Sequence, residues 1–247
     1  MGLVNLFLPK GVNKYSYPCN LYTVFSVLQA VNMNAKTHTF SFKIECHNVF
    51  EVVSSLFHSI LFLRSHGKLQ RTPDGHKESP QHFEDVDLGF IELTYVRNQS
   101  TELQRCVDES IKKFSTELHR CSEPRKGTIS LEFYRIDKRI ATSFLPRHVV
   151  WEAWTINIEI IHLMSVRTIT LNNIRLFDQI TEAIFYINEI VNQSSYVPKL
   201  TDMDQTNLIF DMSFSDVQPY LFKVSHETKL TEFPLLKAVS RFFNNFF

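Results

Sequence analysis

The amino-acid sequence predicts an α+β fold in which about three helices pack on a mainly antiparallel sheet, followed by an amphipathic helix at the C-terminus. Two observations carry this prediction: short segments in which apolar and polar residues alternate, and longer segments with apolar residues at helical spacing. The two kinds of segment are interleaved along the chain in a way that suits two packed layers. A length of 247 residues, 44% of them hydrophobic, allows a sizeable core.

The first predicted elements are a strand and a very apolar helix. In "HTFSFKIE", Phe40, Phe42 and Ile44 alternate with polar residues, which is typical of a strand with one buried face. "NVFEVVSSLFHSILFLR" is apolar almost all round, so we expect a helix buried in the centre of the domain, with Gly67 as its stop. The polar "RTPDGHKESPQHFEDVD" that follows predicts a loop.

The middle of the chain predicts three strands around an amphipathic helix. "GFIELTYVR" is expected to be a strand, and "STELQRCVDESIKKFSTELHR" a helix in which Thr101 and Gln104 fit a capping box. "GTISLEFYRI" and "WEAWTINIEII" predict strands on either side of an irregular segment. The apolar stripe of the helix consists of Leu103, Val107, Ile111, Phe114 and Leu118.

Both tryptophans of the chain lie in "VVWEAWTINIEII". In steps of two, Trp154 shares a face with the isoleucines that follow it, whereas Trp151 lies on the opposite face. We therefore expect Trp154 in the core and Trp151 against the back of the sheet or the base of the preceding loop.

A third helix is predicted over about 173–191, within "NNIRLFDQITEAIFYINEIVNQ". Ile174 and Phe185 lie off its main stripe and leave apolar groups on a second face, which makes them candidates for a partner interface. Two extended segments follow, "NLIFDMSF" and "VQPYLFKVS". The main stripe of the helix consists of Phe177, Ile180, Ile184, Ile187 and Val191.

The C-terminal segment 231–247, "TEFPLLKAVSRFFNNFF", has apolar residues at helical spacing. Such a helix can dock on its own domain, bind a partner or lie on a membrane. We expect it to pack loosely on the domain and to contact other proteins through Leu236, Phe243 and Phe246.

Composition narrows the class of function. The 26 basic residues balance 26 acidic ones, so net charge gives no reason to expect nucleic acid or an anionic membrane as the main partner. Four dispersed cysteines, the lack of a signal-peptide pattern and the lack of a long apolar run predict a cytoplasmic protein with reduced thiols.

Catalytic and cofactor motifs are missing from the sequence. It contains no GxSxG, GxxxxGK[ST], GxGxxG or HExxH, and its ten histidines are scattered. We therefore expect a protein that is not an enzyme and holds no cofactor or metal. A small hydrolase that uses dispersed His and Asp residues is the alternative from a different class. It would need a pocket in which such groups converge.

Phe144 and Leu145 stand in the proline-flanked segment between two predicted strands. Loops normally carry polar side chains, so this pair either folds back under the sheet or serves a partner. The sequence pattern alone leaves both alternatives open.

Several separate blocks occur in a recognisable order: "FIELTYVR", "TEL", "SLEFY", "WEAWT", "YVPK" and "DVQPYLFKVS". Together they resemble the autophagy-related protein 101 family over roughly residues 33–230. The resemblance implies a HORMA-like domain over 33–230, with residues 1–32 as an N-terminal extension of unknown role and 231–247 as the C-terminal helix.

The resemblance also implies a function in assembly. The family forms a heterodimer with the HORMA domain of autophagy-related protein 13, stabilises it, and acts with the scaffold of the autophagy-initiation kinase complex at the phagophore assembly site. Related HORMA pairs dimerise around the third helix. A HORMA adaptor that captures a peptide, as checkpoint and translesion-synthesis members do, is the alternative within interaction proteins. Membrane contact is expected to be peripheral at most.

One functional element of the family is altered in this chain. Between the "SLEFY" and "WEAW" strands the family has an exposed finger in which a Trp and a Phe recruit downstream factors. The corresponding segment, within residues 136–148, contains no Trp and is about one residue longer. Phe144, flanked by Leu145, is the only match for the aromatic residue of the finger, and we expect this pair to recruit in altered form.

Overall fold

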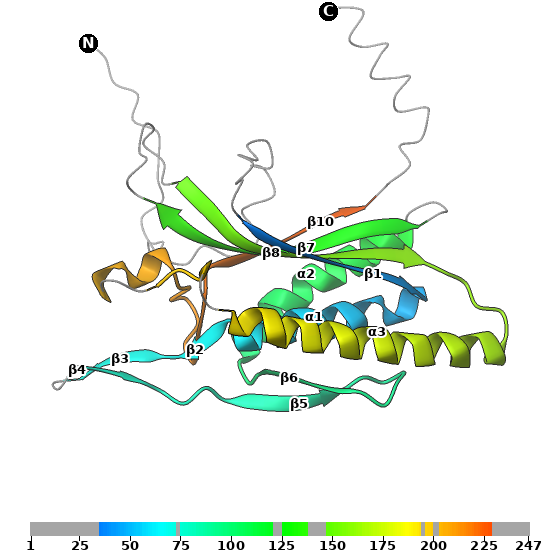
Figure 1. Ribbon diagram of the computed structural model, residues 1–247, viewed down its shortest axis with the longest axis horizontal. Helices are drawn as coiled ribbons and strands as arrows, with labels where there is room; N and C mark the ends of the chain where they lie inside the picture. The colour runs from blue at the N-terminus through cyan, green and yellow to red at the C-terminus, as the bar shows by residue number, and fades with distance from the viewer. Residues whose placement is uncertain are drawn as a thin grey trace, which may run out of the picture. The chain divides into compact units, whose positions relative to one another are not determined.

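The computed structural model describes residues 35–72, 75–120, 125–137, 147–193, 196–199 and 203–228. In this part of the chain three helices cover one face of a four-stranded sheet, which confirms the α+β prediction (Figure 1). The elements are β1 (Lys36–Ile44), η1 (Cys46–Asn48), α1 (Val49–Leu63), β2 (Ser65–Gly67), β3 (Leu69–Thr72), β4 (Gly75–Glu78), β5 (Phe83–Asp87), β6 (Thr94–Asn98), α2 (Thr101–Arg120), β7 (Lys126–Asp137), β8 (Arg147–Ile160), α3 (Val166–Asn192), η3 (Met203–Leu208), β9 (Val217–Pro219) and β10 (Phe222–Thr228).

The sheet has the strand order β1-β8-β7-β10 and is mostly antiparallel, with β1 parallel to β8. The side of the sheet that faces the helices is mostly apolar, with Phe42, Ile156 and Leu131 among its buried residues. The opposite side carries polar residues joined across strands, such as Thr128 to Asn157 at 2.9 Å. This division follows from the period-two pattern of the sequence.

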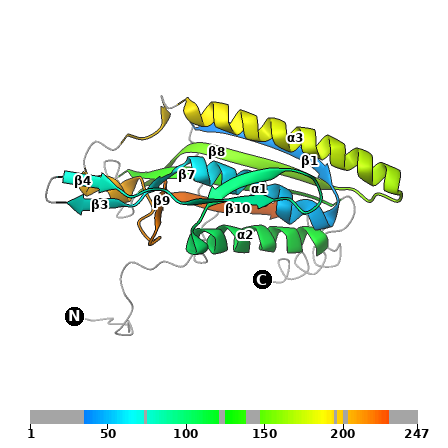
Figure 2. The same cartoon turned by 90° about the horizontal axis from the view of Figure 1, so that it is seen from below.

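α1 lies in the centre of the domain, as its nearly uniform apolar surface predicts. The sheet lies on one side of it, α2 and α3 flank it, and the β5–β6 hairpin covers the remaining side (Figures 1 and 2). The stretch Cys46–Leu63 is long and apolar enough to pass as a membrane span by length and composition, but two thirds of it (67%) is buried inside the domain. It is a core helix. Its stop differs from the prediction, because the helix ends at Leu63 and Gly67 belongs to β2.

α2 buries the predicted stripe of five apolar residues, Leu103 to Leu118. Its predicted capping box is wrong. Ser100 Oγ accepts from the Leu103 amide at 3.4 Å, and the Gln104 side chain bonds outward to Glu84 and to the Asn98 carbonyl. A hydroxyl one residue earlier takes the capping position because it precedes the first helical residue.

α3 begins earlier than predicted, at Val166, because Ser165 and Thr168 form a capping box before it. Its buried stripe is also rotated relative to the prediction. Phe177 is 38% exposed, whereas Asn172 and Leu176 are buried. Tertiary packing selects this stripe since the helix meets both β1 and α1. The buried positions are Asn172, Leu176, Ile180, Ala183 and Ile187.

The predicted loop at 71–87 and the strand at 89–97 were partly wrong. β3 pairs with β4, and β5 pairs with β6 across a turn over residues 88–93. These short strands are polar, so they lack the alternation that marks a buried strand. Cross-strand contacts hold the second hairpin instead, including Arg97 Nε to Glu84 Oε1 at 2.7 Å and a bond from Thr94 to Asp87.

The segment "NLIFDMSF" was predicted to be extended, but it begins in η3 and contains only an isolated bridge from Phe210 to Tyr220. "VQPYLFKVS" is divided between β9, which pairs with β2, and β10, which pairs with β7. This segment therefore leaves the β2–β9 sheet at Pro219 and enters the four-stranded sheet at Phe222. The spacing of apolar residues does not show when a segment changes the strand with which it pairs.

A β-bulge explains where the tryptophans lie. The register of β7 against β8 shifts after Phe133, which leaves Trp151 as an extra residue in β8. The extra residue breaks the alternation, so Trp151 is buried in the same core as Trp154. It lies against Phe133 and Tyr220, with ring centroids 5.5 and 5.2 Å away. The core prediction is confirmed for Trp154, and the back-face prediction for Trp151 is wrong.

Candidate functional site

The outward face of α3 carries an unusual number of exposed apolar side chains. Ile174 is 56% exposed and Phe185 is 70% exposed. They are eleven residues apart, close to three helical turns, so both lie on the side of α3 that faces away from the core. Leu171 is exposed on the same side. The structure therefore places the two predicted interface residues, Ile174 and Phe185, on one surface. Leu171, which was not predicted, lies on the same surface.

Leu171 was missed because the predicted helix began after it. The signal that could have found it is the Ser165–Thr168 capping box, which moves the helix start toward the N-terminus. With the earlier start, Leu171 lies one turn before Ile174 on the same face.

Polar contacts fix α3 against the rest of the domain along its length. Near its start, the Arg175 guanidinium donates to the Lys43 carbonyl at 2.9 Å. Further along, the Tyr186 hydroxyl meets His38 Nδ1 at 2.9 Å. Because these contacts join α3 to β1, the exposed face next to them is presented on a rigid support.

His38 is itself buried in an aromatic cluster under α3. Its ring stacks on Trp154 with 4.1 Å between centroids, and Tyr186 meets it edge-on at 5.6 Å. Burial lowers the pKa of His38 below its ordinary value, since removal from water disfavours the imidazolium, and this outweighs the attraction of the Glu152 carboxylate.

A buried ion pair secures the other end of α3. Arg64 and Glu152 are both buried, and the guanidinium donates from Nε and Nη2 to the two carboxylate oxygens at 2.8 Å each. The Tyr196 hydroxyl donates to Glu152 Oε1 at 2.7 Å, and Arg64 Nη1 reaches the Val191 carbonyl at 3.3 Å. Burial, followed by the nearby carboxylate, raises the pKa of Tyr196 far above its ordinary value, so the hydroxyl remains a donor. Neither residue of this pair was a predicted site residue, because nothing in the local pattern marks Arg64 or Glu152 as buried.

The base of the predicted finger is a continuous ladder. β7 and β8 stay paired up to Asp137 opposite Arg147. The rings of Tyr134 and His148 stack near this end at 4.6 Å. Phe144 and Leu145, the predicted recruitment residues, lie outside the described residues, as do the tail residues Leu236, Phe243 and Phe246.

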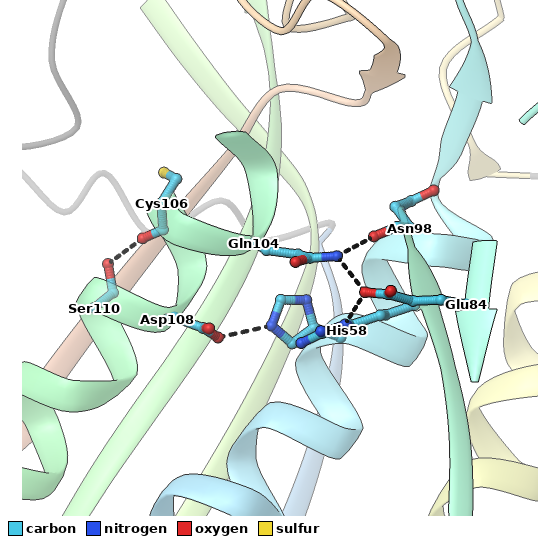
Figure 3. A network of polar contacts seen from close by, with 8 residues as sticks. His58, Glu84, Asn98, Gln104, Cys106, Asp108 and Ser110 are labelled. Atoms are coloured by element: carbon cyan, nitrogen blue, oxygen red, sulfur yellow. Dashed lines mark hydrogen bonds and ion pairs between the residues drawn. The ribbon is translucent and has the colours of Figure 1, made fainter. Parts of the chain in front are cut away.

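A network of polar side chains lies between α1, α2 and the β5–β6 hairpin (Figure 3). The His58 ring from α1 contacts Asp108 of α2 at 2.9 Å, and Gln104 donates to Glu84 at 2.7 Å and to the Asn98 carbonyl at 2.8 Å. These bonds tie α1, α2 and the β5–β6 hairpin together. In the described part of the chain no three His, Cys, Asp or Glu side chains are grouped so as to hold a metal ion.

Comparisons with known proteins agree with one another. The family model for autophagy-related protein 101 matches residues 41–204. Relatives of that name include one from Xenopus tropicalis, 32% identical over 79% of this chain and 89% of its own length, and one from Homo sapiens, 30% identical over the same shares. A relative from Arabidopsis thaliana is 26% identical over 48% of this chain and 50% of its own length. The chain therefore belongs to the autophagy-related protein 101 family, whose members are non-catalytic, cytoplasmic HORMA-domain proteins of the autophagy-initiation complex.

Proposed function

We propose that this protein is an adaptor in autophagosome formation that heterodimerises with the HORMA domain of autophagy-related protein 13 and stabilises it within the kinase complex. The exposed apolar face of α3, with Phe185 at 70% exposure, carries the proposal. A side chain of this size gains about 1.5–3 kcal/mol when it is fully removed from water, so a partner that covers it is strongly favoured. Recruitment to the phagophore assembly site would follow from this assembly.

Substitution of Phe185 by Asp tests the interface directly. The change places a charge in the centre of the proposed contact, so we expect loss of co-purification with the HORMA domain of autophagy-related protein 13. Phe83→Asp is the matched control, because Phe83 is an exposed phenylalanine on β5 rather than on α3. Both variants should keep the thermal unfolding midpoint of the wild type. Normal partner binding by Phe185→Asp would remove α3 from the interface.

We further propose that Phe144 and Leu145 recruit downstream factors. The ladder that ends at Asp137 and Arg147 supports this, since it holds the two ends of the intervening segment next to each other at one end of the sheet. Replacing both residues with serine should change the free energy of unfolding by less than about 0.5 kcal/mol and abolish recruitment. A loss of several kcal/mol would place the pair in the core instead.

The C-terminal segment 231–247 is proposed to assist assembly while packing loosely on the domain. In support, the sheet face that lies away from the helices carries polar side chains, among them Ser130 and Thr155, and offers no match for an apolar helix face. Removing residues 231–247 should leave the unfolding midpoint almost unchanged and weaken binding to other autophagy factors. Cooperative loss of the fold would show that the segment belongs to the core.

A further inference from the structure

We propose that the start of α3 is a membrane-contact site, in which Met164 and Val166 insert into the interface of a bilayer that contains anionic lipids. This goes beyond the adaptor function and does not depend on it. The proposal rests on the position of these residues in the fold, their exposure and the charges around them.

The proposed membrane-contact site lies at one end of the four-stranded sheet. Ile44 of β1 pairs with Ile160 of β8, and the Ile160 amide donates to the Arg125 carbonyl just before β7. The chain passes from Ile160 through residues 161–165, which include Met164, into α3. Figures 1 and 2 both show the first turns of α3 extending past the ends of α1 and α2, so this part of the helix projects from the domain.

The apolar groups stand at the tip of that projection. Met164 is 97% exposed and Val166 is 81% exposed, the two highest values among the exposed large hydrophobic residues that the structure describes. The capping box between Ser165 and Thr168 fixes the backbone between and beyond them. Two apolar side chains are therefore exposed to water on an ordered turn. Because they are not buried, they contribute no hydrophobic stabilisation to the fold.

At this end of the sheet and the start of α3, basic residues outnumber acidic ones: Lys43, Arg125, Lys126, Arg167 and Arg175 against Glu45, Glu92 and Glu159. Between Glu159 and Asp178 the chain carries Arg167 and Arg175 and no acidic residue. Glu159 itself lies between two lysines, with Lys43 at 3.5 Å and Lys126 at 3.3 Å. The net charge of the whole protein is zero, so a patch with this sign depends on how the fold distributes charge and not on composition.

A bilayer fits this tip better than a protein does. Stable protein interfaces bury roughly 1,200–2,000 Å² in total, which a projecting turn with two apolar side chains does not supply. Shallow insertion of apolar residues flanked by Arg or Lys is how peripheral proteins bind anionic membranes. The tip is 19 residues, or about 28 Å along the helix, from Phe185 and eight residues, or about 12 Å, from Ile174. The membrane and partner surfaces are therefore neighbours on α3, and the test measures partner binding beside flotation.

The test is flotation of the full-length chain with vesicles of phosphatidylcholine that contain 30% phosphatidylserine, compared with phosphatidylcholine alone. We expect flotation with the anionic vesicles only. It should fall at least tenfold for the Met164→Ser, Val166→Ser double variant and for Arg167→Glu. The matched control is the Phe83→Ser, Met212→Ser double variant, which removes two exposed apolar residues elsewhere and should float like the wild type.

Three results would overturn the proposal. The first is a wild-type chain that does not float with anionic vesicles. The second is flotation that survives the Met164/Val166 substitutions, which would assign membrane binding to another segment such as 231–247. The third is a Met164/Val166 double variant that loses both flotation and the HORMA partner, which would make the start of α3 part of the protein interface. Loss of flotation with partner binding retained separates this site from the proposed heterodimer.

Discussion

Substitution of Arg64 by Met tests how the buried ion pair supports the domain. Glu152 is completely buried and accepts three hydrogen bonds, two from Arg64 and one from Tyr196. Without Arg64, the Tyr196 hydroxyl would be the one remaining hydrogen-bond donor to the buried Glu152 carboxylate among those described above. Removing one partner of such a pair costs about 3–5 kcal/mol, because the remaining charge stays out of water. We expect a loss of that size in the free energy of unfolding.

A double variant separates the pair from its surroundings. When Arg64→Met is combined with Glu152→Leu, no buried charge remains, and exchanging buried pairs for apolar residues is neutral or stabilising by about 1–4 kcal/mol. The Tyr196 hydroxyl loses both its acceptor, Glu152, and its donor, Arg64 Nη2, and the Val191 carbonyl loses Arg64 Nη1. These losses offset about 1–3 kcal/mol of that gain. The double variant should therefore lie within about 2 kcal/mol of the wild type, well above the single variant.

Urea unfolding followed by tryptophan fluorescence measures both variants. Trp151 is a suitable reporter since the Arg64 guanidinium lies 5.5 Å from the centre of its ring. Two results would refute the reasoning. One is a single variant that loses less than about 1 kcal/mol, and the other is a double variant that loses as much as the single variant.

Three further predictions concern other parts of the fold. Because burial lowers the pKa of His38, the free energy of unfolding should be highest above about pH 6.5 and should fall as the pH drops through the folded-state pKa. Urea unfolding at pH 7.5 and pH 5.5 should show this loss of stability. The His38→Phe variant should show a smaller loss between the two pH values. Gly67→Ala should cost about 1–3 kcal/mol, since its Cβ would lie 1.7 Å from a backbone oxygen, whereas Gly89→Ala, with 3.5 Å to its nearest neighbour, should be nearly neutral in the same assay. Asp108→Ala should lower the free energy of unfolding by about 1–3 kcal/mol, because it leaves the buried His58 ring without this partner; an unchanged midpoint would contradict that.

Periodicity was sufficient for the elements that are buried on one stripe or one face. α1, the stripe of α2 and the core side of β8 follow from the spacing of apolar residues, because burial is the dominant force on these segments. Trp154 is the clearest example. The family resemblance added the HORMA fold, which spacing alone did not distinguish from other two-layer arrangements.

Features that depend on contacts between distant residues could not be predicted in the same way. The position of Trp151 depends on a bulge, which is visible only in the pairing of β7 with β8. Arg64 and Glu152 are 88 residues apart, and nothing local marks either as buried. The outward face of α3 was found only in part, since Ile174 and Phe185 stand out from the stripe whereas Leu171 precedes the predicted start of the helix.

The ladder between β7 and β8 has a consequence for how this family can diverge. Pairing up to Asp137 and Arg147 is maintained by the strands themselves, so the connection between them need only close a gap that is already short. Doubling the length of a flexible connection costs only about 0.6 kcal/mol in closure entropy. The connection predicted to form the finger can therefore gain a residue or exchange its aromatic residues while "SLEFY" and "WEAW" stay in register beside it. We infer that the binding preference of this connection can change at little cost to folding.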